Sequence, residues 1–76
     1  MTGMIKKVIG PKQFGFIIAN GIEYFFHRED FNGFWEDLVR DNESHEEIKV
    51  TFVPKDTPKG PRAREVRRTD FPNAAA

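Results

Sequence analysis

Apolar and polar side chains alternate along several short stretches of this chain, and residues that favour turns bound each stretch. Alternation with a period of two is typical of a β-strand that buries one face. The pattern predicts five strands, at residues 4–9, 14–19, 22–27, 48–53 and 62–68. Asn20-Gly21 joins the second strand to the third, and this dipeptide favours the positive φ angles of a two-residue type I′ turn. Pro54 is predicted to end the fourth strand, because proline cannot donate a backbone hydrogen bond.

The remaining segments are predicted to connect these strands. Apolar side chains recur every three to four positions in residues 31–39, which indicates a short helix or helical turn. Residues 39–47 are expected to continue as a long acidic loop, and residues 55–61 form a loop rich in proline and glycine. In the fifth strand, regular alternation places Ala63 and Val66 on opposite faces.

Five short strands with one tight hairpin favour a small, closed or nearly closed all-β barrel, because closure removes the exposed strand edges of an open sheet. We expect an antiparallel barrel formed by one domain at residues 1–70, followed by a flexible tail at residues 71–76. An SH3-like barrel satisfies the same pattern, so the strand spacing alone does not select one topology.

The second and third strands carry more aromatic side chains than the interior of a small barrel can hold. Alternation places four rings outward, those of Phe14, Phe16, Phe25 and His27. Ile17 and Phe26 fall on the opposite, core-facing side. Burial is the simpler explanation for any single phenylalanine, but the narrow interior is already filled by Ile5, Ile17, Phe26, Val50 and Phe52. A face made of rings is typical of the platforms that bind single-stranded nucleic acid by stacking.

Charge is segregated along the chain although the net charge is zero. Residues 1–28 carry a net charge of +3, residues 29–47 carry −7, and residues 48–76 carry +4. A phosphate backbone responds to the local potential, so two basic segments that fold together attract it despite the acidic one. For any single lysine or arginine, ordinary solvated surface charge is the simpler explanation.

Other classes of function have little support in the sequence. The chain has no cysteine, which excludes disulfides and thiolate zinc sites, and no second histidine stands at metal-ligand spacing from His27. No apolar run is long enough to span a membrane, and the first residues lack the pattern of a secretory signal, so we expect a cytoplasmic protein. The carboxylates near Glu36 and Asp37 have no nucleophile or pocket beside them, so we expect no catalysis, cofactor or metal.

Four motifs follow one another in a defined order along the chain. They are Gly3-x-Ile5-Lys6, Lys12-Gln13-Phe14-Gly15-Phe16-Ile17, Phe25-Phe26-His27 and Lys59-Gly60-Pro61-x-Ala63-x-x-Val66. Together they resemble the cold-shock domain, a family of five-stranded OB-fold barrels that bind single-stranded RNA and DNA. In that family the outward rings stack on successive bases while nearby lysines contact phosphates. The resemblance implies stacking by the four outward rings and phosphate contacts by Lys6 and Lys12.

The chain departs from the family pattern at several positions. Lys7 stands where the family usually has a base-stacking tryptophan, and Arg28 stands where a phenylalanine often follows the histidine. A guanidinium plane can still lie against a base. The connection through residues 39–47 is longer and more acidic than the family's loop. Trp35 lies near a position at which the family tends to expose a phenylalanine, so Trp35 or Phe34 is expected either to add a peripheral stacking ring or to pack beneath this segment.

These observations predict a monomer that binds single-stranded RNA or DNA and acts as an RNA chaperone by favouring unpaired strands. The candidate binding residues are Lys6, Lys7, Lys12, Phe14, Phe16, Phe25, His27, Arg28, Trp35, Lys59 and Arg62. An alternative is a protein-interaction module, in which Lys7, Arg28 and the acidic segment divert the aromatic surface to a polypeptide. A third is a domain that only folds.

Overall fold

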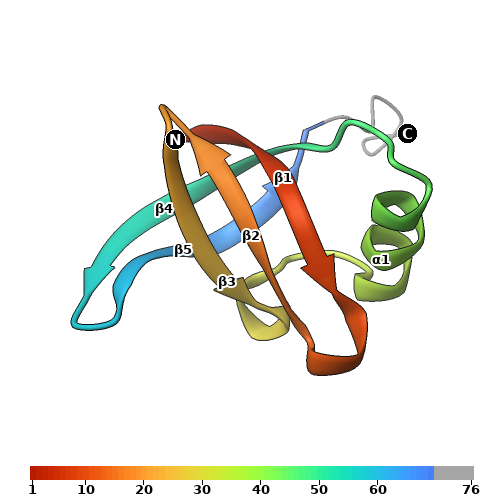
Figure 1. Ribbon diagram of the computed structural model, residues 1–76, viewed down its shortest axis with the longest axis horizontal. Helices are drawn as coiled ribbons and strands as arrows, with labels where there is room; N and C mark the ends of the chain where they lie inside the picture. The colour runs from red at the N-terminus through yellow and green to blue at the C-terminus, as the bar shows by residue number, and fades with distance from the viewer. Residues whose placement is uncertain (70–76) are drawn as a thin grey trace.

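The computed structural model describes residues 1–69, which form a closed five-stranded barrel with a helix at one end (Figure 1). The strands are β1 (Thr2–Ile9), β2 (Phe14–Ala19), β3 (Ile22–His27), β4 (Lys49–Thr57) and β5 (Gly60–Arg68). They are connected by the 3₁₀ turns η1 (Gly10–Lys12) and η2 (Arg28–Asp30) and by helix α1 (Trp35–Glu43). The predicted tail at residues 71–76 lies outside the described residues.

The strands follow the order β1-β2-β3-β5-β4 around the barrel, and β4 pairs with β1 to close it. β3 and β5 run parallel, with Phe25 beside Arg62, whereas the other neighbouring strands are antiparallel. The prediction of an entirely antiparallel barrel is therefore wrong. Strands that alternate in direction around a closed ring must be even in number, so a ring of five must contain a parallel pair.

The β2–β3 hairpin confirms the predicted turn. Ala19 pairs with Ile22, and the φ angles of Asn20 and Gly21 are 54° and 77°. Positive φ at both central residues is the property of a type I′ turn, which matches the twist of the two strands it joins.

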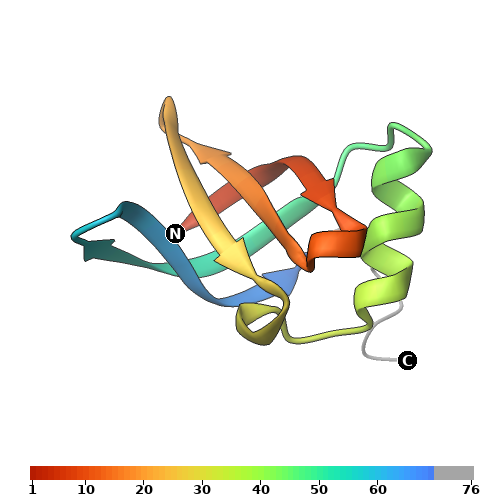
Figure 2. The same cartoon turned by 60° about the horizontal axis from the view of Figure 1, so that its bottom comes forward.

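The β4–β5 hairpin is longer than predicted and projects away from the end of the barrel that carries α1 (Figure 2). β4 continues through Pro54 to Thr57, so the prediction that Pro54 ends the strand is wrong. β4 pairs with β1 only between Lys49 and Thr51, which leaves its later part paired with β5 alone. Proline is tolerated on such an edge because its missing donor faces no neighbouring strand.

A bulge in β5 changes which of its side chains face the core. Ala63 and Val66 are both completely buried, so the prediction that they lie on opposite faces is wrong. Glu65 has a φ of 51°, and the pairing of β4 with β5 shifts between Thr51 and Val53. The extra residue in the bulge turns Val66 back toward the interior.

The acidic segment between β3 and β4 contains helix α1, which confirms the predicted short helix. Residues 39–43 belong to this helix, so the prediction of a continuous loop over residues 39–47 is wrong. Glu36 and Asp37 lie in the first turn, where carboxylates interact favourably with the helix dipole. Part of the negative charge of this segment is therefore explained by helix formation.

The core lies inside the barrel and extends beneath α1. Its buried side chains are those of Ile17, Ala19, Tyr24, Phe26, Phe31, Trp35, Leu38, Ile48, Val50, Phe52, Ala63 and Val66. The Trp35 ring centroid lies 6.1 Å from that of Phe26 and 6.3 Å from that of Phe31. α1 lies at one end of the barrel (Figure 1), and its tryptophan packs into the core there.

A buried ion pair fastens α1 to β5 and predicts a pH dependence of stability. Arg68 Nη1 donates to Asp41 Oδ2 over 2.8 Å, and this hydrogen bond is the main cause of a pKa of Asp41 below its ordinary value of 3.8. A carboxyl whose folded-state pKa is lowered stabilises the fold above the unfolded pKa, and that stabilisation is lost as the pH falls through the folded pKa. We expect Asp41→Asn to be less stable than wild type near neutral pH, and to lose less stability on acidification.

Urea unfolding at about pH 7 and about pH 2.5 measures both effects. Asp37→Asn is a matched control, because the Asp37 side chain is 41% exposed whereas that of Asp41 is 11% exposed. Equal acid-induced losses in wild type and Asp41→Asn would contradict the assigned role of this pair.

Candidate nucleic-acid interface

The β2–β3 hairpin has one buried face and one aromatic face, as the alternation predicted. Ile17 and Phe26 are completely buried. The other side carries four half-exposed rings, which are called the aromatic face here: Phe14, Phe16, Phe25 and His27. They form two direct cross-strand pairs, Phe14 with His27 and Phe16 with Phe25. The four predicted stacking residues are therefore brought together on one surface.

The three phenylalanine rings of the aromatic face support one another. The centroid of Phe14 lies 5.8 Å from that of Phe16 and 5.5 Å from that of Phe25, and the last two are 6.0 Å apart. These separations are typical of edge-on and tilted aromatic contacts. A Cβ atom on Gly15 would lie 2.7 Å from the Lys7 carbonyl oxygen, so glycine permits the close approach of β1 behind the rings. These contacts hold the three rings together in one surface.

A row of neighbouring side chains continues the aromatic face across four strands. A register shift in β1 makes Lys6 an extra residue and pairs Lys7 with Phe16. Phe16 pairs with Phe25, and Phe25 pairs with Arg62 of β5. The row thus reads lysine, phenylalanine, phenylalanine, arginine. The Arg62 Cζ atom lies 5.7 Å from the centroid of the Phe25 ring, within the range of a cation–π contact.

A groove lies between the aromatic face and the β4–β5 turn. Its volume is about 570 Å³, and its lining residues are Phe16, Phe25, His27, Thr57, Lys59, Gly60, Pro61 and Arg62. One wall is therefore aromatic, and the other carries the cations Lys59 and Arg62. That combination suits a planar base on one side and a phosphate on the other.

His27 is oriented by the 3₁₀ turn that follows it. The backbone N–H of Glu29 donates to His27 Nδ1 over 3.1 Å, and the backbone N–H of His27 donates to Asp30 Oδ2 over 3.0 Å. An accepting Nδ1 leaves the proton of the neutral ring on Nε2. The imidazole therefore joins the aromatic face with a defined tautomer and with Nε2–H as a donor.

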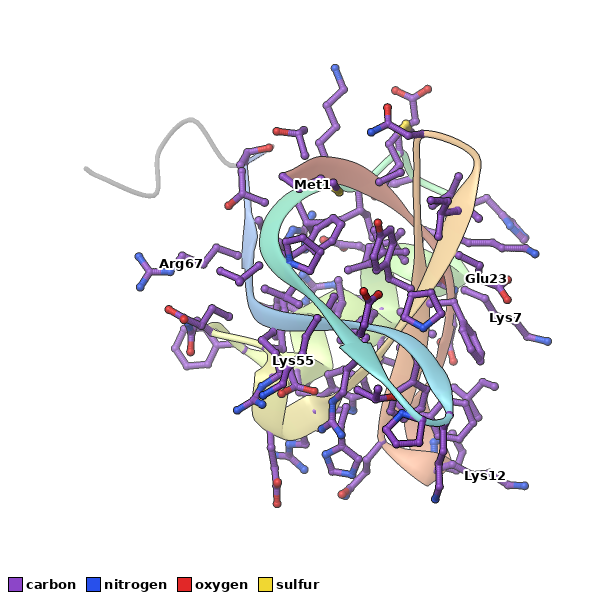
Figure 3. The ribbon with its side chains drawn as sticks, turned by 90° about the vertical axis from the view of Figure 1, so that its left-hand side faces the viewer. Met1, Lys7, Lys12, Glu23, Lys55 and Arg67 are labelled. Carbon is purple, nitrogen blue, oxygen red and sulfur yellow. The ribbon has the colours of Figure 1, made fainter. Side chains whose placement is uncertain are left out.

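The positively charged side chains among the candidate binding residues divide into paired and free cations. Lys6 Nζ lies 2.8 Å from Glu23 Oε2, Arg28 Nη2 lies 3.6 Å from Glu36 Oε2, and Arg62 Nη2 lies 2.9 Å from Asp30 Oδ2. Among residues 1–69, the candidate binding residues that are exposed cations without an ion-pair partner are Lys7, Lys12 and Lys59. Lys7 and Lys12 lie on the same side of the barrel, whereas Arg67 projects from the opposite side (Figure 3).

Trp35 does not belong to the interface. Its side chain is 5% exposed and packs in the core, so its assignment as a nucleic-acid-binding residue is wrong. The neighbouring Phe34 is 79% exposed instead. Of the two side chains left open by the sequence, Trp35 packs beneath the acidic segment, and Phe34 is exposed outside the aromatic face.

Three charged residues near the interface were missed by the sequence analysis. Asp30 is buried beside His27, Arg64 forms an ion pair with it, and Lys55 of β4 stands opposite Arg62 in the strand pairing. Asp30 follows His27 by three positions, a spacing that signals capping of a turn. Lys55 was missed because the fourth strand was expected to end at Pro54.

The site consists of an aromatic surface, a basic wall and a closed barrel beneath them. Within residues 1–69, no group of three or more metal-ligating side chains is close enough to hold an ion. No helix in the same range combines the length and apolar character needed to cross a membrane. A scan against models of protein families finds no match to this chain, and a search of curated protein sequences also finds no match.

Proposed function

We propose that this chain is a single-stranded nucleic-acid-binding barrel of the OB-fold class, related to the cold-shock domain. The strand order, the parallel contact of β3 with β5 and the helix between β3 and β4 fit a five-stranded Greek-key barrel. In such barrels the surface of the second and third strands is a common site for oligonucleotides. The aromatic face occupies the corresponding surface here.

The observation that carries the proposal is the half-exposure of four clustered rings, three of which contact one another, beside unpaired lysines. Apolar rings exposed to water do not contribute the stabilisation that burial would give. Their clustering on the surface therefore favours a role in contacting a flat ligand. Base–aromatic stacking contributes about 1–3 kcal/mol for each stacked base. Every base has a π face, so this contribution tolerates many sequences, and RNA and DNA both offer it.

Phosphate contacts add a contribution that depends on salt. We assign them chiefly to Lys7, Lys12 and Lys59, because the charges of Lys6, Arg28 and Arg62 already face carboxylates. A protein that binds unpaired strands and not duplexes shifts weak secondary structure toward the open form by mass action. RNA chaperone activity without an energy source follows from this preference.

Binding of a labelled pyrimidine-rich oligonucleotide tests the proposal. Fluorescence polarisation in low and moderate salt is expected to show saturable binding of the single strand, and much weaker binding of a duplex of the same length. Equal binding of duplex and single strand would indicate a charge-driven contact without stacking. Absence of binding in low salt would overturn the proposal and favour the protein-interaction module.

Lys12→Ala is expected to reduce the salt dependence of binding. The affinity at high salt should change little. Loss of one phosphate contact reduces the slope of log K against log salt by about 0.7 for a single strand. Lys12 lies at the end of η1, is exposed and has no ion-pair partner among the described residues. Polarisation titrations at several salt concentrations measure the slope.

Arg67→Ala is the matched control for Lys12→Ala, because Arg67 is exposed on the opposite side of the barrel (Figure 3). It removes one positive charge from the protein without touching the interface. If Arg67→Ala flattens the slope as much as Lys12→Ala does, net charge and not a local contact explains the salt dependence.

A further inference from the structure

A buried carboxylate beside the aromatic face holds two arginines and one backbone amide. The side chain of Asp30 is 5% exposed. Its Oδ2 accepts hydrogen bonds from Arg62 Nε over 3.1 Å, from Arg62 Nη2 over 2.9 Å and from the His27 backbone N–H over 3.0 Å. Its Oδ1 lies 3.0 Å from Arg64 Nε. Asp30 therefore connects β3, at His27, with β5.

These contacts fix one edge of the Arg62 guanidinium. Its Nε and Nη2 both donate to Asp30, and 36% of the side chain remains exposed. The Cζ atom lies 5.7 Å from the centroid of the Phe25 ring. Two hydrogen bonds from one edge to one carboxylate leave the guanidinium little rotational freedom, and its planar group can stack as well as carry charge. Arg62 is thus held as a planar neighbour of Phe25.

We propose that Asp30 is a positioning residue that makes Arg62 the third planar element of the row, after Phe16 and Phe25. The inference rests on the proposed function and refines it. Arg62 contacts a base through its guanidinium plane and its Nη1 donors, while Asp30 compensates its charge. A phosphate gains less from this compensated cation than from Lys12 or Lys59, which are free.

This role and simple electrostatics predict opposite effects of Asp30→Asn. The substitution removes a negative charge beside the interface, so charge alone predicts tighter binding of a phosphate backbone. Loss of positioning predicts weaker binding, by at least about fivefold, which corresponds to the lower limit for one stacked base. The sign of the change therefore separates the two explanations.

Arg62→Lys tests the same idea without removing the buried carboxylate. Lysine keeps the charge but has neither the plane nor two donors on one edge. We expect at least about fivefold weaker binding of the single-stranded oligonucleotide, with an unchanged salt slope. Arg67→Lys, an equivalent change on the exposed far side, is expected to bind as wild type. In the Asp30→Asn background, Arg62→Lys should weaken binding little further, because Arg62 has already lost its hydrogen bonds to the carboxylate.

Polarisation titrations of these variants, each with its thermal unfolding curve, decide the matter. Weaker binding by folded Arg62→Lys, non-additive with Asp30→Asn, supports the positioning role. Wild-type affinity of Arg62→Lys, or tighter binding by Asp30→Asn, overturns it while leaving the proposed function intact. If Asp30→Asn does not fold, Arg62→Lys alone decides. If wild type itself does not bind single strands, the proposed function fails and this role fails with it.

Discussion

Replacing Phe16 and Phe25 together with alanine is expected to weaken binding of a single-stranded oligonucleotide by roughly 30-fold or more. The two rings form the central cross-strand pair of the interface and lie 6.0 Å apart. Loss of two stacking contacts at about 1–3 kcal/mol each amounts to about 2–6 kcal/mol. Because stacking does not involve counterion release, the loss should be similar at low and moderate salt. Polarisation titrations at both salt concentrations measure it.

Phe34→Ala is the matched control for this double variant. Phe34 is 79% exposed but lies at the start of α1, outside the aromatic face. Its removal is expected to leave the affinity within about twofold, since no stacked base is assigned to it. A folded Phe16→Ala/Phe25→Ala variant that binds as tightly as wild type would exclude base stacking at this surface.

Trp35→Ala is expected to cause the largest loss of stability of any single change considered. The side chain is 5% exposed and contacts Phe26 and Phe31, so its removal leaves a cavity between α1 and the barrel. Truncation of a buried tryptophan costs about 3–5 kcal/mol. A chain of this length has a total stability of only about 4–11 kcal/mol, so much of it would be lost. Urea or thermal unfolding measures the change.

The adjacent Phe34 again provides the comparison. Its phenyl ring is exposed, and surface substitutions usually change stability by less than about 0.5 kcal/mol. Phe34→Ala should therefore have nearly the same unfolding midpoint as wild type. Similar losses for Trp35→Ala and Phe34→Ala would contradict the burial of the tryptophan beneath α1.

The aromatic face could be predicted from the sequence because β2 and β3 are regular. Both strands pair without a bulge, so the period of two holds along each, and Ile17 and Phe26 identify the buried side. The Asn20-Gly21 turn fixes their register. Under these conditions local sequence is enough to decide which rings share a surface.

Bulges explain why alternation does not give the side-chain orientations along β5 and β1. In β5 the positive φ of Glu65 inserts an extra residue, so Ala63 and Val66 face the core together. In β1 the bulge at Lys6 brings Lys7 into line with Phe16. Neither irregularity changes the composition of its strand, and alternation alone does not reveal it.

Contacts between distant residues explain the remaining differences. Phe34 and Trp35 are neighbours with similar side chains, and the packing of Phe26 and Phe31 selects the tryptophan for burial. Asp30 and Arg62 are 32 positions apart, so periodicity does not indicate that they pair. The sequence therefore predicted the charge of Arg62 but not its partner, and the partner changes its expected role.

The ring resonances of the protein during titration with a single-stranded oligonucleotide test the central claim most directly. Stacked bases shift nearby ring protons upfield, so NMR spectra should show upfield changes for Phe14, Phe16, Phe25 and His27. The buried Trp35 should respond little, and it serves as an internal reference. Saturable shifts confined to the four rings are the predicted result. Binding that leaves these rings unchanged, or shifts only those near Phe34, would contradict the account.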